Sequence, residues 1–130
     1  MKYMGIDYGE KRVGIAVSDE GGKMAFPLDV LSNDKRLLQR IKQACKSEKI
    51  KQIVIGASKD LAGKDNPIFR DAKEFSKKLS TSIKLPIYWE PEFYTTKEAQ
   101  RLQGKHGMLD ASAAAIILKS FLDKKAPKKR

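Results

Sequence analysis

Three acidic residues stand where a predicted strand ends or a predicted helix begins. Asp7 closes the first predicted strand, Glu92 follows a later strand between Pro91 and Phe93, and Asp110 opens the last predicted helix. Ligands of α/β sheets collect beyond the carboxyl ends of the strands. We therefore expect the three carboxylates to lie near one edge of a sheet.

Carboxylates gathered at one edge would repel one another and lose hydration. A divalent cation such as Mg²⁺ or Mn²⁺ resolves that conflict because it prefers oxygen ligands. Two such ions about 3.5–4 Å apart can activate water and stabilise the leaving oxygen when a phosphodiester is hydrolysed. Asp7, Glu92 and Asp110 are therefore the candidate catalytic and metal-binding residues.

Each carboxylate also has a purely structural interpretation. Asp7 and Gly9 suit a tight turn, Asp110 suits the N-cap of a helix, and Glu92 suits an exposed loop. Helical spacing nevertheless places Asp110 at the start of a core-facing stripe, because residues three or four apart share a face. That stripe continues through Ala113, Ala114, Ile117 and Phe121. The small residues at 111–115 allow this helix to lie close to a sheet.

The elements that must position these residues begin with three strands. Alternating and β-branched patterns predict strands over residues 2–7, 12–18 and 24–31, joined by glycine-containing turns. Strands joined so tightly form an antiparallel meander. Pro27 cannot donate a ladder hydrogen bond, so we expect the third strand to lie at an edge or to carry a bulge.

Helices and strands then alternate. The predicted order is a helix around residues 37–45 with its N-cap at Asn33 or Asp34, a buried strand at 53–55, a helix after Asn66-Pro67, a strand within 83–89, a helix opening at Thr95, and a last helix from about Asp110 to Asp123. This order predicts an α/β fold with a mixed five-stranded sheet, in which parallel strands extend the meander and helices cover both faces. We expect one domain over residues 1–123 and a basic C-terminal tail over residues 124–130.

Composition limits the class of protein. A chain of 130 residues is the size of one domain, and its single cysteine, Cys45, excludes an internal disulfide and a cysteine zinc site. No apolar run approaches the ~20 residues of a membrane helix, and no signal peptide is recognisable, so we expect a cytoplasmic protein without membrane contact.

The net charge of +11 points to a polyanionic partner such as nucleic acid. The basic excess lies in residues 34–51, with seven basic and two acidic residues, and in residues 119–130, with six and one. Most charges of the first segment suit a solvated helix face. Tyr88, Trp89, Phe93 and Tyr94 could stack bases, although we expect at least two of them to fill a sheet edge and the core.

The segment from Gly5 to Asp19, Gly-Ile-Asp-Tyr-Gly-Glu-Lys-Arg-Val-Gly-Ile-Ala-Val-Ser-Asp, resembles the opening motif of the YqgF/RuvX-like family. These are RNase H-fold proteins described as Holliday-junction-resolvase homologues and pre-16S ribosomal RNA nucleases. Residues 53–56, 95–99 and 109–118 resemble further segments of the family. The resemblance implies an RNase H-like fold, Asp7, Glu92 and Asp110 as catalytic acids, and Lys11 and Arg12 as the basic pair that holds nucleic acid.

The resemblance implies a Mg²⁺- or Mn²⁺-dependent nuclease that processes the 5′ end of precursor 16S ribosomal RNA, with branched DNA as the alternative substrate. The chain departs from the family where an Asp-Glu-Arg triplet reads Pro91-Glu92-Phe93, and where Ala62 replaces an acid. A phenylalanine cannot make a bidentate phosphate contact. A nucleic-acid-binding module with impaired catalysis therefore remains a rival interpretation, and both a monomer and a homodimer stay open.

Overall fold

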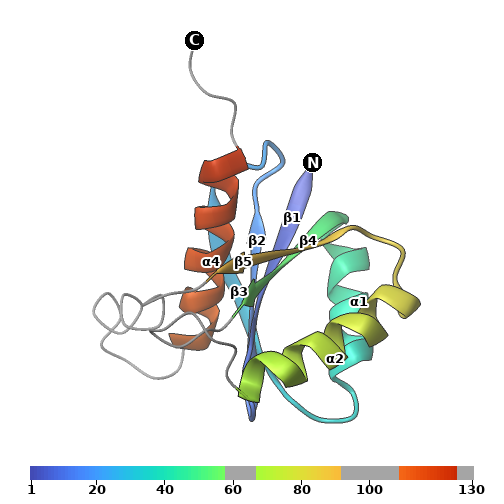
Figure 1. Cartoon of the computed structure of the whole chain (residues 1–130). Coiled ribbons are helices and arrows are strands. Elements are labelled where there is room, and N and C mark those ends of the chain that lie inside the picture. The colour runs from blue at the N-terminus through green and yellow to red at the C-terminus, as the bar shows by residue number, and fades with distance from the viewer. Residues whose placement is uncertain (58–66, 92–108, 126–130) are drawn as a thin grey trace.

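The computed structural model describes residues 1–57, 67–91 and 109–125, in which helices cover both faces of a central sheet (Figure 1). The strands are β1 (Lys2–Tyr8), β2 (Arg12–Ser18), β3 (Ala25–Ser32), β4 (Ile50–Ala57) and β5 (Ile87–Pro91). The helices are α1 (Leu37–Ser47), α2 (Pro67–Ser82) and α4 (Leu109–Lys125). The helix predicted to open at Thr95 falls outside the described residues.

The five strands form one mixed sheet in the order β3-β2-β1-β4-β5. β1 pairs antiparallel with β2, and β2 pairs antiparallel with β3, which is the predicted meander. β4 and β5 extend it as parallel strands on the other side of β1. The predicted five-stranded mixed sheet is therefore confirmed.

The expectation for Pro27 is confirmed in both respects. β3 is an edge strand, and its register against β2 shifts between Ile15 and Ala16, where Ala16 pairs with Pro27. Proline is tolerated there because an edge strand leaves half of its N–H groups without a ladder partner.

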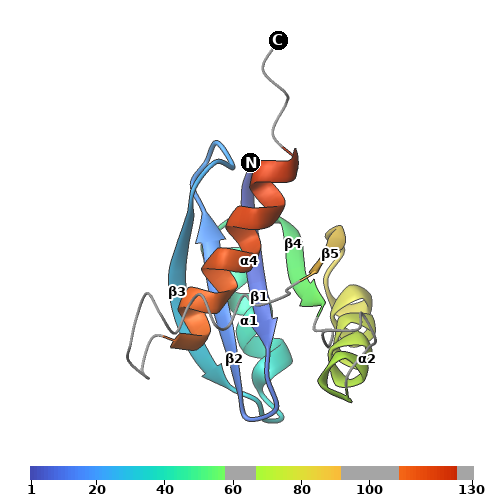
Figure 2. The same cartoon turned by 60° about the vertical axis from the view of Figure 1, so that its left-hand side comes forward.

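Alternation along β1 separates two hydrophobic cores. Met4 and Ile6 are fully buried against α1 and α2, in a core that includes Ile41 and Leu79. Tyr3 lies on the opposite face, in a smaller core formed with α4. Figure 2 shows α4 running across its face of the sheet, with α1 on the far side.

Three predicted details are wrong. The N-cap of α1 is Arg36, without a side-chain cap, and Asp34 instead accepts a hydrogen bond of 2.9 Å from the Arg36 N–H in the preceding turn. β5 begins at Ile87, after Pro86, and extends to Pro91, beyond the predicted range. α4 continues to Lys125, two residues beyond Asp123, where the last helix is predicted to end.

Candidate functional site

Asp7 lies one residue before the end of β1 and is half-buried. It pairs with Gly14 of β2, so its backbone is held within the central part of the sheet. Successive side chains of a strand point to opposite faces. Asp7 therefore shares the face of Tyr3 and Gly5, which is the face that α4 covers.

The direction of α4 follows from its contacts along β1. The ring of Tyr3 lies 6.1 Å from that of Phe121, in the C-terminal half of the helix. Two residues further along the strand, Gly5 lies against Ala114 and Leu118. Moving toward the end of β1 therefore moves toward the N-terminus of α4, as Figures 1 and 2 also show.

α4 approaches the sheet so closely that β1 has no room for a side chain at Gly5. A Cβ atom there would lie 2.7 Å from the Leu118 Cβ and 2.9 Å from the Ala114 carbonyl oxygen. The helix contributes Ala111, Ala113 and Ala114 to the interface, each at most 1% exposed. The prediction that small residues allow close contact is confirmed, and this contact sets the position of the first turn of the helix.

The turn between β1 and β2 is fixed by a close backbone contact within it and by hydrogen bonds from Asn33. A Cβ atom at Gly9 would lie 2.3 Å from the Arg12 carbonyl oxygen, so glycine is required by the close approach of the backbone. The Asn33 side chain donates a 2.8 Å hydrogen bond to the Gly9 carbonyl, and the Asn33 N–H donates one of 2.9 Å to the Lys11 carbonyl. The turn that carries the basic pair is therefore ordered by the end of β3.

Lys11 and Arg12 are both exposed, at the same end of the sheet as Asp7. Arg12 is the first residue of β2 and pairs with Ser32. Their exposure leaves both side chains within reach of a ligand that approaches this end of the sheet.

The other two predicted acids are described less fully. Asp110 is the second residue of α4, so its backbone lies in the turn that α4 brings to the end of β1. Its side chain falls outside the described residues, and so does Glu92 as a whole. The structure thus brings Asp7 and the first turn of α4 to one end of the sheet, and leaves the position of Glu92 a prediction.

Sequence reasoning missed Glu90, a buried carboxylate on β5 that is 3% exposed. It pairs with Gly56 of β4, the residue that follows Ile55, and Ile55 forms the last pair between β4 and β1. Its Oε2 accepts hydrogen bonds from the Ser120 hydroxyl at 2.6 Å and the Lys124 ammonium at 2.7 Å. If the predicted strand had extended past Trp89, alternation would have placed Glu90 on the same face as Tyr88. Glu90 would then have been recognised as a carboxylate within a strand of the sheet.

Two aromatic residues near the predicted acids have intramolecular roles, as expected. Trp89 packs edge-on against Phe69 with 5.1 Å between ring centres, and Tyr88 lies 5.4 Å from Phe121. Phe93 and Tyr94 fall outside the described residues.

The donor set can be compared with the requirements of a divalent cation. The three predicted ligands are carboxylates, and hard cations prefer oxygen ligands, so their chemistry fits Mg²⁺ or Mn²⁺. In the part of the chain that the structure describes, no three His, Cys, Asp or Glu residues are grouped closely enough to hold a metal ion. Of the three predicted ligands, Asp7 alone has a side chain within the described residues.

Comparison with known proteins places the chain in a family. The family model described as RuvX, Holliday junction resolvase, matches residues 1–124. The chain belongs to this family, which confirms the resemblance read from its opening motif.

The names of similar proteins agree with this assignment. A protein of Nitratidesulfovibrio vulgaris named "Putative pre-16S rRNA nuclease" is 35% identical over 95% of this chain and 94% of its own length. One of Sulfurihydrogenibium with the same name is 33% identical over 95% and 90%.

Among solved structures, Thermus thermophilus RuvC in complex with a Holliday junction superposes with a TM-score of 0.62 at 17% identity, covering 96% of both chains. The fowlpox virus Holliday junction resolvase gives 0.56 at 12% identity, covering 95% of this chain and 99% of its own. At this identity the likeness concerns the fold alone, and it confirms the RNase H-like architecture.

Proposed function

We propose that this chain is a divalent-metal-dependent nuclease that hydrolyses phosphodiester bonds in precursor 16S ribosomal RNA, at the 5′ end. Membership of the resolvase family and the names of its relatives support a nuclease. The net charge of +11 suits a polyanionic substrate. Such a protein acts in the cytoplasm, where ribosomes assemble, as a monomer or a homodimer. No helix in the described ranges 1–57, 67–91 and 109–125 has the length and apolar character to cross a membrane.

One observation carries the proposal: Asp7 stands at the end of β1 on the face covered by α4, and α4 runs so that the turn containing Asp110 comes to that same end. The direction of this closely packed helix relative to the central strand supports a shared role for the two acidic positions. Rigid support suits metal ligands because a catalytic site must hold its groups within fractions of an ångström.

Asp7, Glu92 and Asp110 would hold Mg²⁺ or Mn²⁺ through their carboxylate oxygens. When bound, the cation supplies Lewis-acid stabilisation of the charge on the transferred phosphate and lowers the pKa of water. Lys11 and Arg12, exposed at the adjoining turn, would hold the phosphates that flank the cleaved bond. Asn33 and Gly9 keep that turn in place and so orient the basic pair relative to Asp7.

Branched DNA is the second candidate substrate, because the family model carries the description Holliday junction resolvase. The two substrates can be separated in one assay. We would incubate the purified protein with 5′-labelled precursor ribosomal RNA and with a four-way DNA junction, each in Mn²⁺ or in EDTA. We expect discrete RNA products in Mn²⁺ and none in EDTA. If the junction is cleaved and the RNA stays intact, the second candidate is favoured. No product from either would contradict a nuclease and favour a binding module.

A further inference from the structure

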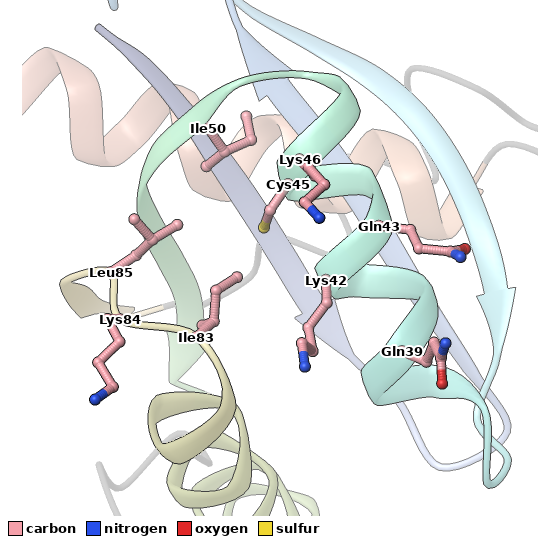
Figure 3. Close-up of a pocket in the computed structure, with 9 residues that line it drawn as sticks. All are labelled: Gln39, Lys42, Gln43, Cys45, Lys46, Ile50, Ile83, Lys84 and Leu85. Atoms are coloured by element: carbon pink, nitrogen blue, oxygen red, sulfur yellow. The ribbon is translucent and has the colours of Figure 1, made fainter.

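A groove lies on the face of the sheet opposite α4, between α1, the start of β4 and the connection from α2 to β5 (Figure 3). Its volume is about 520 Å³. Ile50, which lines it, is the first residue of β4 and pairs with Lys2, five residues before Asp7. The groove is therefore on the other face, and at the other end of the sheet, from the site proposed above.

Three lysines from two separate segments line this groove. Lys42 and Lys46 stand one helical turn apart on α1, and Lys84 lies on the connection across from them (Figure 3). All three are exposed. In the described part of the chain none of them makes an ion pair, so their charges are available to a ligand.

Lys23 and Lys78 are likewise exposed and make no ion pair in the described part of the chain, but neither lines this groove. Two half-buried lysines elsewhere are paired. Lys2 pairs with Glu48 at 3.0 Å, and Lys119 pairs with Asp123 at 2.6 Å. Three like charges around one concavity, without an ion-pair partner in the described part of the chain, raise the local positive potential, although the Lys84 side chain points away from α1 (Figure 3). An anion is therefore the ligand that the groove fits.

The rest of the lining is suited to an extended chain. Gln39 and Gln43 add amide groups on the α1 side, and Ile83 and Leu85 form part of an apolar floor. Lysine and glutamine side chains commonly contact phosphate and sugar groups. The volume is that of a small-molecule site, so the groove admits a few linked groups of a single strand and not the full width of a duplex.

We propose that this groove binds single-stranded RNA that flanks the cleaved segment of the substrate. The proposal rests on the proposed function for its choice of RNA as the polyanion. Lys42, Lys46 and Lys84 each neutralise a phosphate, and the apolar floor accommodates the sugar and base of the same strand. The groove thereby holds a long substrate at a second place, remote from Asp7.

The test measures RNA binding in EDTA, where cleavage is excluded. A fluorescent, unstructured 20-nucleotide RNA is titrated with the native chain and with a Lys42→Gln/Lys46→Gln/Lys84→Gln variant, over a series of salt concentrations. Each lost phosphate contact should reduce the slope of log affinity against log salt by about 0.7 on a single strand, hence by about 2 for three contacts. We expect the affinity at 150 mM salt to fall about 10- to 50-fold.

A matched control removes the same charge elsewhere. In Lys23→Gln/Lys77→Gln/Lys78→Gln the three lysines are exposed on the β2–β3 turn and on α2, and none of them lines the groove. We expect this control to bind several-fold more tightly than the groove variant. Equal affinities would show that net charge alone acts, and would overturn the proposal. An undiminished affinity of the groove variant would also overturn it, and would leave the groove to another anion such as an acidic protein segment.

A second measurement leaves the lysines intact. A Gln43→Cys/Cys45→Ala variant carries a thiol-reactive benzophenone at the groove on its only thiol, because Cys45, which also lines the groove, is the single native cysteine. We expect light-induced crosslinking to the 20-nucleotide RNA from position 43 and not from a Lys23→Cys/Cys45→Ala control. Absence of a crosslink at 43 would contradict the proposal. Because both measurements are made without cleavage, an inactive protein that passes them contradicts the nuclease and not the groove.

Discussion

The face of the sheet under α4 has small residues, Gly5 and Ala16, where the helix comes closest, whereas large aliphatic side chains fill the core under α1 and α2. On the α4 face, Gly5 lies so close to Ala114 and Leu118 that a Cβ atom would clash with them. On the opposite face, Met4 and Ile6 of the same strand fill the core under α1 and α2. Small residues fix how near a helix lies, and large ones fill a volume between layers. Asp7 lies on the face under this closely packed helix, and Asp110 lies in the first turn of the helix itself.

The comparison predicts that the α1/α2 face is most sensitive to lost volume. Leu79 is fully buried in that core, so Leu79→Ala should leave a cavity and lower the free energy of unfolding by about 2–5 kcal/mol. Leu79→Met, which conserves volume, should cost less than about 1.5 kcal/mol. Urea denaturation of both variants measures the difference, and a loss below about 1 kcal/mol for Leu79→Ala would refute the comparison.

The α4 face should instead be sensitive to added volume. Gly5→Ala places a methyl group 2.9 Å from a backbone oxygen that cannot move without the helix, so we expect a loss of about 1–3 kcal/mol. Gly21→Ala is the control, because a Cβ there meets only the Asp19 Oδ2, at 3.9 Å. It should alter the unfolding free energy by less than about 0.5 kcal/mol. Equal stability of the two variants would mean that α4 is not closely packed.

Alkaline titration sharpens the comparison at Cys45. Burial raises the pKa of this thiol from 9.0 to about 11. Above pH 9 the unfolded chain therefore loses this proton before the folded one, so stability should fall as pH rises, by at most about 1.4 kcal/mol per pH unit up to pH 11. Thermal melts of the native chain and of Cys45→Ala between pH 8 and 11 check this. A native chain that follows the variant throughout would contradict the burial of the thiol.

The smallest expected effect concerns two lysines of α4. Lys124 pairs with Glu90, whose side chain is 4% exposed, and Lys119 pairs with Asp123, whose side chain is 61% exposed. Lys124→Ala should destabilise the chain by about 1 kcal/mol, because a buried carboxylate loses a charged donor. Lys119→Ala should cost less than about 0.5 kcal/mol, as exposed pairs contribute little. Denaturation midpoints that rank the two in the reverse order would refute this role of Glu90.

Much of the fold follows from sequence periodicity. The first three strands and the β-branched run at 53–55 have patterns that local rules recognise, and Pro27 marks an edge through its missing donor. The predicted range of β5 begins too early because Ile83 and Leu85 continue an apolar pattern across Pro86. In the structure these two residues belong to the connection between α2 and β5 and line the groove. Local patterns do not show where a connection ends against a neighbouring helix.

The candidate site was predictable in part. Asp7 could be placed from its position at a strand end, and the direction of α4 supports the choice of Asp110. Glu90 was missed because its importance comes from Ser120 and Lys124, thirty or more residues away in the chain. Contacts of this kind depend on how α4 crosses the sheet, which no local pattern encodes.

The central claim is that Asp7 holds a catalytic metal ion at the end of β1. The most direct measurement compares the rates at which the native chain, Asp7→Asn and Asp71→Asn cleave precursor ribosomal RNA in Mn²⁺, with RNA binding measured in EDTA. Asp71 is exposed on α2, on the other face of the sheet, and serves as the control. We predict that Asp7→Asn loses activity by about 1,000-fold or more, since several kcal/mol of transition-state stabilisation disappear, while its RNA affinity and the activity of Asp71→Asn persist. An Asp7→Asn variant that cleaves as fast as the native chain would contradict the account.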